Sequence, residues 1–160
     1  MGYTHYWRRP ATIPQAAMCA IADDFGRVVL TLDDAGIKLS GGHGEDAPHI
    51  TPEGVCFNGL SNCEHSPTDL CEGDCSHEAF AFLRIFRPAD WQRPENGLFL
   101  DTCKTASKSY NVAVMVLLLI AKHHVPQIEI STEGGGRTLG RGATILSKHI
   151  WARKRMSCEL

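Results

Sequence analysis

The feature that most constrains this 160-residue sequence is the apolar segment Val112 to Ala121, inside a predicted helix from Tyr110 to His124. Its apolar side chains occur nearly all round the helix axis instead of forming one stripe. A helix with this pattern is buried on several sides in a folded protein. The apolar run is also only half of the roughly 20 residues that cross a bilayer. The rest of the chain must therefore supply layers that cover this helix.

A second helix is predicted from Thr12 to a C-terminal cap at Gly36. Apolar residues recur in it at steps of three and four, and Thr12 with Gln15 matches a capping box. Residues 40–51 are predicted to form a loop, and Asn58-Gly59 is a turn signal. Short strands are predicted at residues 3–8, 55–57, 78–86, 98–103 and 128–131, and a third helix at 143–153. The order β-α-β-β-β-α-β-α predicts one α+β domain over residues 1–160, a mixed sheet packed by two or three helices. The tryptophans Trp7, Trp91 and Trp151 are interpreted as packing residues.

Charge and cysteine content narrow the function classes. Sixteen basic and eighteen acidic side chains give a net charge of −2, which offers no reason to expect nucleic acid or an acidic membrane as partner. The N-terminus lacks a signal-peptide pattern. Seven cysteines without a secretory context are expected to be reduced thiols or metal ligands. We therefore expect a cytoplasmic protein, and the oligomeric state stays open.

The segment 61–77 is a polar, cysteine-rich loop inserted between predicted strands. Its potential ligands follow the spacing C-x-H-x5-C-x3-C-x-H, and zinc takes four such thiolate or imidazole ligands in a tetrahedron. This predicts one structural zinc ion, and the alternative is a polar insertion with thiols. The predicted ligands are Cys63, His65, Cys71 and Cys75, with His77 as an alternative fourth ligand.

Several polar residues stand at the ends of predicted strands or at a helix start, where loops gather over a sheet. His5, His77 and Glu78 are the candidate acids or bases, because a His-Glu pair beside a lysine suits proton transfer. The alternative for His5 is a hydrogen-bonded structural residue, and for Asn58 a role in the turn. The candidate ligand-binding residues here are Tyr3, His5, Asn58, Lys104 and Tyr110, with Lys104 placed before a helix start to meet an anion.

The segment 134–142 is rich in glycine and runs into the predicted third helix. Backbone N–H groups of such a loop can approach an anion closely, and Arg137 and Arg141 could bind phosphate oxygens bidentately. The Lys-Ser/Thr pair of a Walker motif is missing, so a flexible surface loop is the alternative.

Several blocks of the sequence are similar to an uncharacterised family of small proteins from phages, prophages and bacteria. The chain opens with MGYTHYW, and further matching blocks are Phe57-Asn58-Gly59, Ser76 to Phe80 and Cys103-Lys104-Thr105. The family pattern has Pro-Tyr-Asp where this chain has Ser109-Tyr110-Asn111, and the glycine-rich segment does not match it. The resemblance implies a phage or prophage setting in a bacterial host, with a role in host takeover or in countering host defence. It implies no particular reaction.

These observations leave three hypotheses about function. The first is a protein that sequesters or processes a small phosphate-bearing ligand, such as a nucleotide signal. The second is a hydrolase or phosphodiesterase acting on a nucleotide-like substrate through His5, His77 or Glu78. The third is an interaction module whose cysteine-rich loop is stabilised by zinc.

Overall fold

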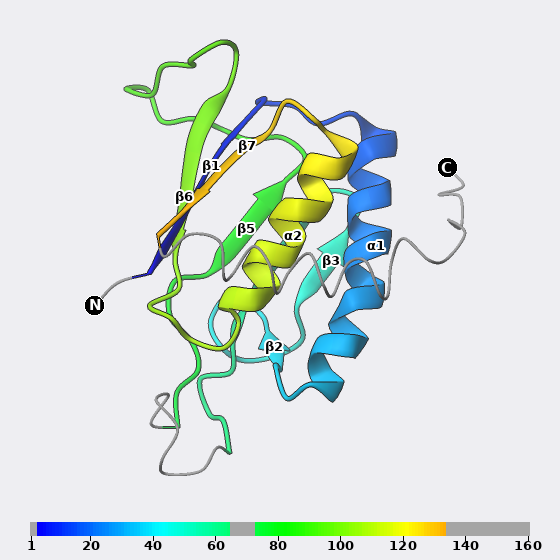
Figure 1. The fold of residues 1–160 in the computed structure, drawn as a ribbon, viewed down its shortest axis with the longest axis vertical. Coiled ribbons are helices and arrows are strands. Elements are labelled where there is room, and N and C mark those ends of the chain that lie inside the picture. Colours follow the sequence, from blue (N-terminus) through cyan, green and yellow to red (C-terminus); the bar gives the residue numbers. More distant parts are fainter. Residues whose placement is uncertain (1–2, 65–72, 134–160) are drawn as a thin grey trace.

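The structure is a computed structural model that describes residues 3–64 and 73–133 (Figure 1). The predicted glycine-rich loop with Arg137 and Arg141, the predicted third helix, and His65 and Cys71 lie outside these described residues.

The N-terminal strand is the central strand of a three-stranded antiparallel sheet. β1 (Thr4–Arg9) pairs with β6 (Phe99–Lys104) on one side and with β7 (Glu129–Thr132) on the other. Side chains alternate along β1, so that His5, Trp7 and Arg9 are buried while Thr4, Tyr6 and Arg8 are partly exposed.

The second sheet is built around β4 (Gly54–Gly59). β4 pairs with β2 (Leu39–Ser40) and β3 (His49–Thr51), and also with β5 (Phe80–Leu83). Every ladder in the described residues is antiparallel. The prediction of an α+β domain is confirmed, but the prediction of one mixed sheet is wrong, because the strands form two antiparallel sheets.

Two helices, α1 (Gln15–Asp34) and α2 (Asn111–His124), pack against each other beside the sheets (Figure 1). α2 is buried on nearly all sides, as its sequence predicted. A buried hydrogen bond of 2.6 Å joins Asp24 Oδ2 on α1 to His124 Nε2 on α2, and both side chains are 6% exposed. In the described part of the chain, no helix has the length and apolarity to span a membrane.

Aromatic side chains connect the two sheets and α1 into one core. Trp7 of β1 lies 5.3 Å from Phe80 of β5 between ring centroids, and Phe80 lies 5.0 Å from Phe57 of β4. Phe57 stacks on Phe25 of α1 at 5.2 Å. Such contacts add to the burial energy of large side chains, so the sheets and the helix share a single hydrophobic core.

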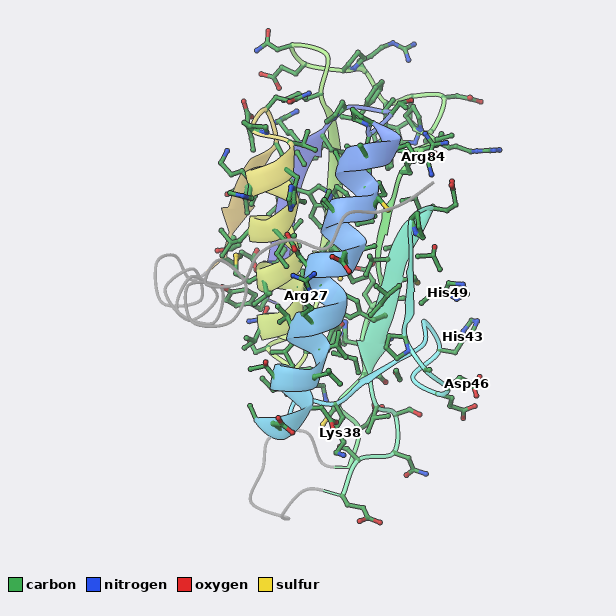
Figure 2. All side chains as sticks on the ribbon, turned by 90° about the vertical axis from the view of Figure 1, so that its right-hand side faces the viewer. Arg27, Lys38, His43, Asp46, His49 and Arg84 are labelled. Atoms are coloured by element: carbon green, nitrogen blue, oxygen red, sulfur yellow. The ribbon has the colours of Figure 1, made fainter. Side chains whose placement is uncertain are left out.

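Some local predictions fail because tertiary contacts override the sequence signals. α1 begins after Pro14 without a side-chain cap, and Thr12 instead bridges Ile85. The predicted C-terminal cap at Gly36 agrees with its positive φ of +83°. The predicted loop at 40–51 contains β3 and the end of β2, and its His43, Asp46 and β3 residue His49 point outward (Figure 2). Trp91 is 79% exposed, which corrects its interpretation as a packing residue.

Candidate functional site

A group of predicted site residues meets where the two sheets come together. We call Asn58, His77, Glu78, Lys104 and Tyr110 the strand-end cluster. The Glu78 N–H donates to the Lys104 carbonyl at 3.3 Å, and the Lys104 N–H donates to Glu78 Oε2 at 2.5 Å. The end of β6 is thereby attached to the residues that precede β5.

Asn58 is fully used in holding this arrangement together. Its Nδ2 donates to the carbonyls of Gly42 at 3.1 Å and His77 at 2.9 Å. Its Oδ1 accepts from the N–H groups of Gly59 at 2.8 Å and His77 at 3.0 Å. An amide offers two donors and two acceptor positions, so the Asn58 side chain acts here as a structural connector with no hydrogen-bonding capacity left for a ligand.

The Tyr110 side chain also has a structural role inside the protein. It is fully buried, and its hydroxyl donates to the Glu78 carbonyl at 2.7 Å. Burial raises the pKa of Tyr110 far above its usual range. The phenol is therefore a neutral structural donor at physiological pH.

Some polar side-chain atoms of the strand-end cluster are exposed and can still bind a ligand or transfer a proton. His77 Nδ1 donates to the Lys104 carbonyl at 2.9 Å, which leaves Nε2 of this exposed histidine as the acceptor nitrogen. The Lys104 ammonium has no partner among the described residues. Of the predicted acid-base and anion-binding groups in the cluster, His77, Glu78 and Lys104 therefore keep solvent-facing polar atoms.

His5 belongs to a separate buried polar group under the start of α2. Its Nε2 hydrogen-bonds to Asn111 Oδ1, which also accepts from Thr105 Oγ1 at 2.9 Å. The Tyr3 ring lies against the His5 ring, with centroids 5.2 Å apart. His5 is fully buried, and its Nδ1 has no hydrogen-bond partner among the residues that the structure describes. The sequence offered no signal for the role of Asn111, whose hydrogen-bond partner His5 lies 106 positions away.

Burial lowers the pKa of His5, opposed by the hydrogen bond to Asn111. The unfolded chain therefore binds more protons than the folded chain just below pH 6.5, and we expect wild-type stability to fall as the pH decreases through this range, by at most about 1.4 kcal/mol per pH unit. His5→Gln keeps a donor for Asn111 and should flatten this dependence. Urea unfolding of both proteins between about pH 5 and 8 measures the difference, and parallel curves would contradict the assignment.

The cysteine-rich segment is described only at its two ends. The Sγ atoms of Cys63 and Cys75 lie 2.8 Å apart. Within residues 3–64 and 73–133, no three metal-binding side chains come together, and His77 is engaged with Lys104. Cys56, Cys63, Cys75 and Cys103 are present as thiols, whereas Cys19 is disulfide-bonded, so the prediction of reduced thiols is wrong for that residue. The zinc ion stays a prediction.

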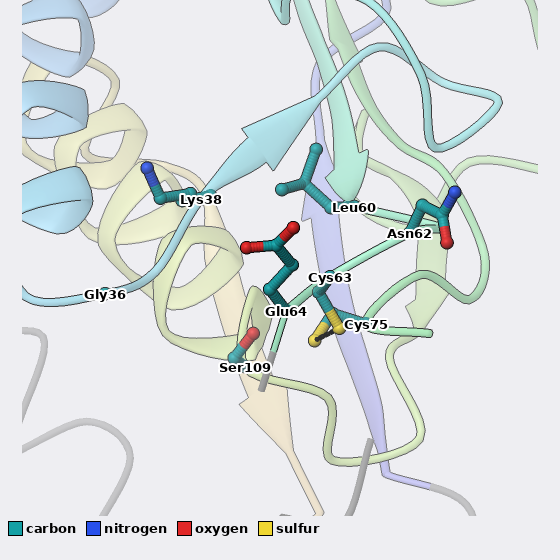
Figure 3. A pocket seen from close by; sticks show the side chains of 8 residues that line it. All are labelled: Gly36, Lys38, Leu60, Asn62, Cys63, Glu64, Cys75 and Ser109. Atoms are coloured by element: carbon teal, nitrogen blue, oxygen red, sulfur yellow. Dashed lines mark hydrogen bonds between the residues drawn. The ribbon is translucent and has the colours of Figure 1, made fainter. Parts of the chain in front are cut away.

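A pocket of about 490 Å³ lies beside this cysteine pair, between the end of α1 and the start of α2 (Figure 3). We call it the end pocket. Lys38, Glu64 and Ser109 supply polar groups from three separate segments, while Asn62 points away in this view. Its lining residues are Gly36, Lys38, Leu60, Asn62, Cys63, Glu64, Cys75 and Ser109. Cys63 and Cys75 were predicted only as zinc ligands, and none of the other lining residues was a predicted site residue, because the fold brings these segments together.

The electrostatics of the end pocket favour a ligand that carries an anion. α2 begins two residues after Ser109, and its first turn carries no acidic residue, although the N–H groups of Asn111 and Val112 already donate to the Lys108 and Ser109 carbonyls. In the described part of the chain, the Lys38 ammonium makes one ion pair, with Asp33 at 3.4 Å, and this pair is exposed. Such pairs contribute little, so the Lys38 ammonium can turn toward a ligand at small cost. Glu64 adds an acceptor for hydroxyl or amino groups.

No protein-family model, curated protein or solved structure matches this chain.

Proposed function

We propose that this protein binds a small phosphate-bearing molecule of nucleotide size in the end pocket, without converting it. The observation that carries this proposal is the convergence of Lys38, Ser109 and Glu64, from three separate segments, on a cavity of about 490 Å³. Small-molecule pockets commonly have volumes between roughly 300 and 1,000 Å³. The phosphate would meet Lys38 and the Ser109 hydroxyl, and Glu64 would accept from a sugar hydroxyl or a base amino group.

Binding is favoured over hydrolysis because the candidate acids and bases lie elsewhere. Among the described residues that line the end pocket there is no histidine. His5 is buried under α2, and the His77 ring is bonded to the Lys104 carbonyl. Together with the resemblance to phage proteins, this leads us to propose that the ligand is a nucleotide signal of a bacterial host, which the protein sequesters against host defence.

The alternative, a protein-interaction module, is favoured by one observation. Trp91 is 79% exposed, and large exposed aromatic side chains are common anchors in protein interfaces. Trp91→Ala should then abolish capture of a partner protein while nucleotide binding at the end pocket is unchanged.

The binding proposal predicts that Lys38→Ala weakens nucleotide affinity by about 10- to 100-fold, the usual value of a hydrogen bond to a charged group. Titration calorimetry with adenosine and guanosine monophosphates, and with inorganic phosphate, measures the affinity. Because Lys38 is largely exposed, wild-type affinity should also fall with added salt. Recovery of the nucleotide unchanged after incubation is expected, and its cleavage would support a hydrolase instead.

Lys104→Ala is the matched control, since Lys104 is an exposed lysine outside the end pocket. It should bind nucleotide like the wild type, and both variants should keep the wild-type melting temperature. If Lys104→Ala lost nucleotide binding while Lys38→Ala bound normally, the binding site would be the strand-end cluster instead of the end pocket. The absence of binding to any of these probes would overturn the proposal.

A further inference from the structure

The two ends of the cysteine-rich segment are held together by backbone bonds. The Cys63 N–H donates to the Gly73 carbonyl at 3.0 Å, and the Cys75 N–H donates to the Leu60 carbonyl at 2.8 Å. These bonds align the two chain segments like neighbouring strands and point both thiols to the same place (Figure 3). The sulfur pair is thus fixed by described residues on both sides.

The separation of the sulfur atoms indicates which chemistry suits them. Two thiolates on one tetrahedral zinc lie about 3.8 Å apart, given Zn–S bonds of ~2.3 Å. A disulfide bond is about 2.05 Å long. At 2.8 Å, the Cys63 and Cys75 sulfurs are too close for two ligands of one zinc ion and need move less than 1 Å to bond.

The two thiols differ in access, which sets an order of reaction. Cys63 is partly exposed, whereas Cys75 is only 2% exposed. Other thiols are less suited to react, because burial raises the pKa of Cys56 and raises that of Cys103 to about 12. A raised pKa lowers the thiolate fraction, and the thiolate is the reacting species.

We propose that Cys63 and Cys75 form a reversible intrachain disulfide by exchange with a small-molecule disulfide such as oxidised glutathione. The Cys63 thiolate attacks one sulfur of the oxidant, forming a mixed disulfide and releasing one thiolate. The Cys75 thiolate then attacks Cys63 Sγ, which forms the intrachain bond and releases the second thiolate. The two protons lost by the cysteines go to the two released thiolates, so the protein is oxidised by two electrons and the small disulfide is reduced.

The bond would also alter the end pocket, because Cys63 and Cys75 form part of its wall. This consequence, unlike the disulfide itself, rests on the proposed function. Oxidation is expected to change nucleotide affinity at least several-fold. The disulfide is measured without any ligand, so failure of the binding proposal and failure of the redox proposal are separate results.

The test exposes the full chain to oxidised glutathione and analyses it by intact mass and by peptide mapping without reduction. Loss of two hydrogen atoms and a linked peptide pair containing Cys63 and Cys75 are expected, reversed by dithiothreitol. The melting temperature should rise by roughly 5 to 10 °C on oxidation, because the bond closes a short loop.

Variants separate the two thiols. Cys75→Ser should stop at the mixed disulfide on Cys63, Cys63→Ser should form neither product, and the control Cys56→Ser should behave like the wild type. Thiols that stay unmodified in the wild type would overturn the proposal. So would a link from Cys63 to another cysteine, or a bound metal that must be removed by a chelator before the pair reacts.

Discussion

Gly59→Ala is expected to destabilise the domain by at least about 3 kcal/mol, the upper range for forcing an atom into a packed interior. A Cβ at this position would lie 1.9 Å from the Cys75 carbonyl oxygen and 2.7 Å from its carbon. It would also lie 3.1 Å from Tyr110 Cδ1. The obstacle is backbone, and that backbone is fixed by the Cys75–Leu60 hydrogen bond and by the Asn58 side chain. No rotation of a side chain can relieve the clash.

Gly26→Ala is the matched control. Gly26 lies inside α1, and a Cβ there would meet no atom of the described residues within 4 Å. Alanine is preferred over glycine in a helix by about 0.5 to 1 kcal/mol, so this variant should be more stable than the wild type. Urea unfolding of both variants measures the two effects with opposite signs. A Gly59→Ala protein within 1 kcal/mol of the wild type would show that residues 73–77 do not press against β4.

Gly59 is also a position at which the sequence predicted the wrong local structure. Asn58-Gly59 predicted a turn, yet both residues are in β4, and the glycine is required by the close approach of a segment from elsewhere in the chain. The long elements were predictable, because periodicity is clear in α1 and β1 and because the continuous apolar run of α2 is long enough for a buried helix. The sequence did not predict β2 and β3, because strands of two and three residues are too short to show an alternating pattern of apolar and polar residues.

For the strand-end cluster, the sequence predicted where the residues lie better than it predicted what each side chain does. Strand ends meet at one edge, so the meeting of Asn58, His77, Glu78 and Lys104 followed from their places in the sequence. Their hydrogen bonds did not, because each depends on a partner far along the chain. The end pocket was not predictable either, since Lys38 and Ser109 become neighbours only when α1 and α2 pack.

The stability cost of replacing the buried Arg9 should depend strongly on the size of the new side chain. Arg9 is fully buried, and its guanidinium carbon lies 4.4 Å from the centre of the Phe82 ring. It donates to the carbonyls of Pro10 and Arg84, but Nη1 has no hydrogen-bond partner within residues 3–64 and 73–133. Burial lowers the pKa of Arg9 to about 10, against the opposing effect of the Asp101 carboxylate. The charge is therefore costly to bury, while the alkyl chain packs well.

Arg9→Ala should cost about 3 to 5 kcal/mol, because it leaves a large cavity. Arg9→Met keeps most of the volume and removes a buried charge whose desolvation is costly and whose Nη1 is unpaired among the described residues. We therefore expect it to unfold within about 1 kcal/mol of the wild type at neutral pH. If Met proves as damaging as Ala, the charge itself stabilises the fold.

The pH dependence gives an independent measurement of the same charge. Because the folded pKa of Arg9 is about 10 and its ordinary value is 12.5, the unfolded chain binds more protons between these values. Arg9 therefore makes wild-type stability increase with pH across that range, a contribution that Arg9→Met lacks. Urea unfolding of the two proteins at about pH 9 and 11 should show the wild type gaining stability relative to Arg9→Met. An unchanged difference would mean that Arg9 keeps an ordinary pKa in the folded protein, with solvent or a partner compensating its burial.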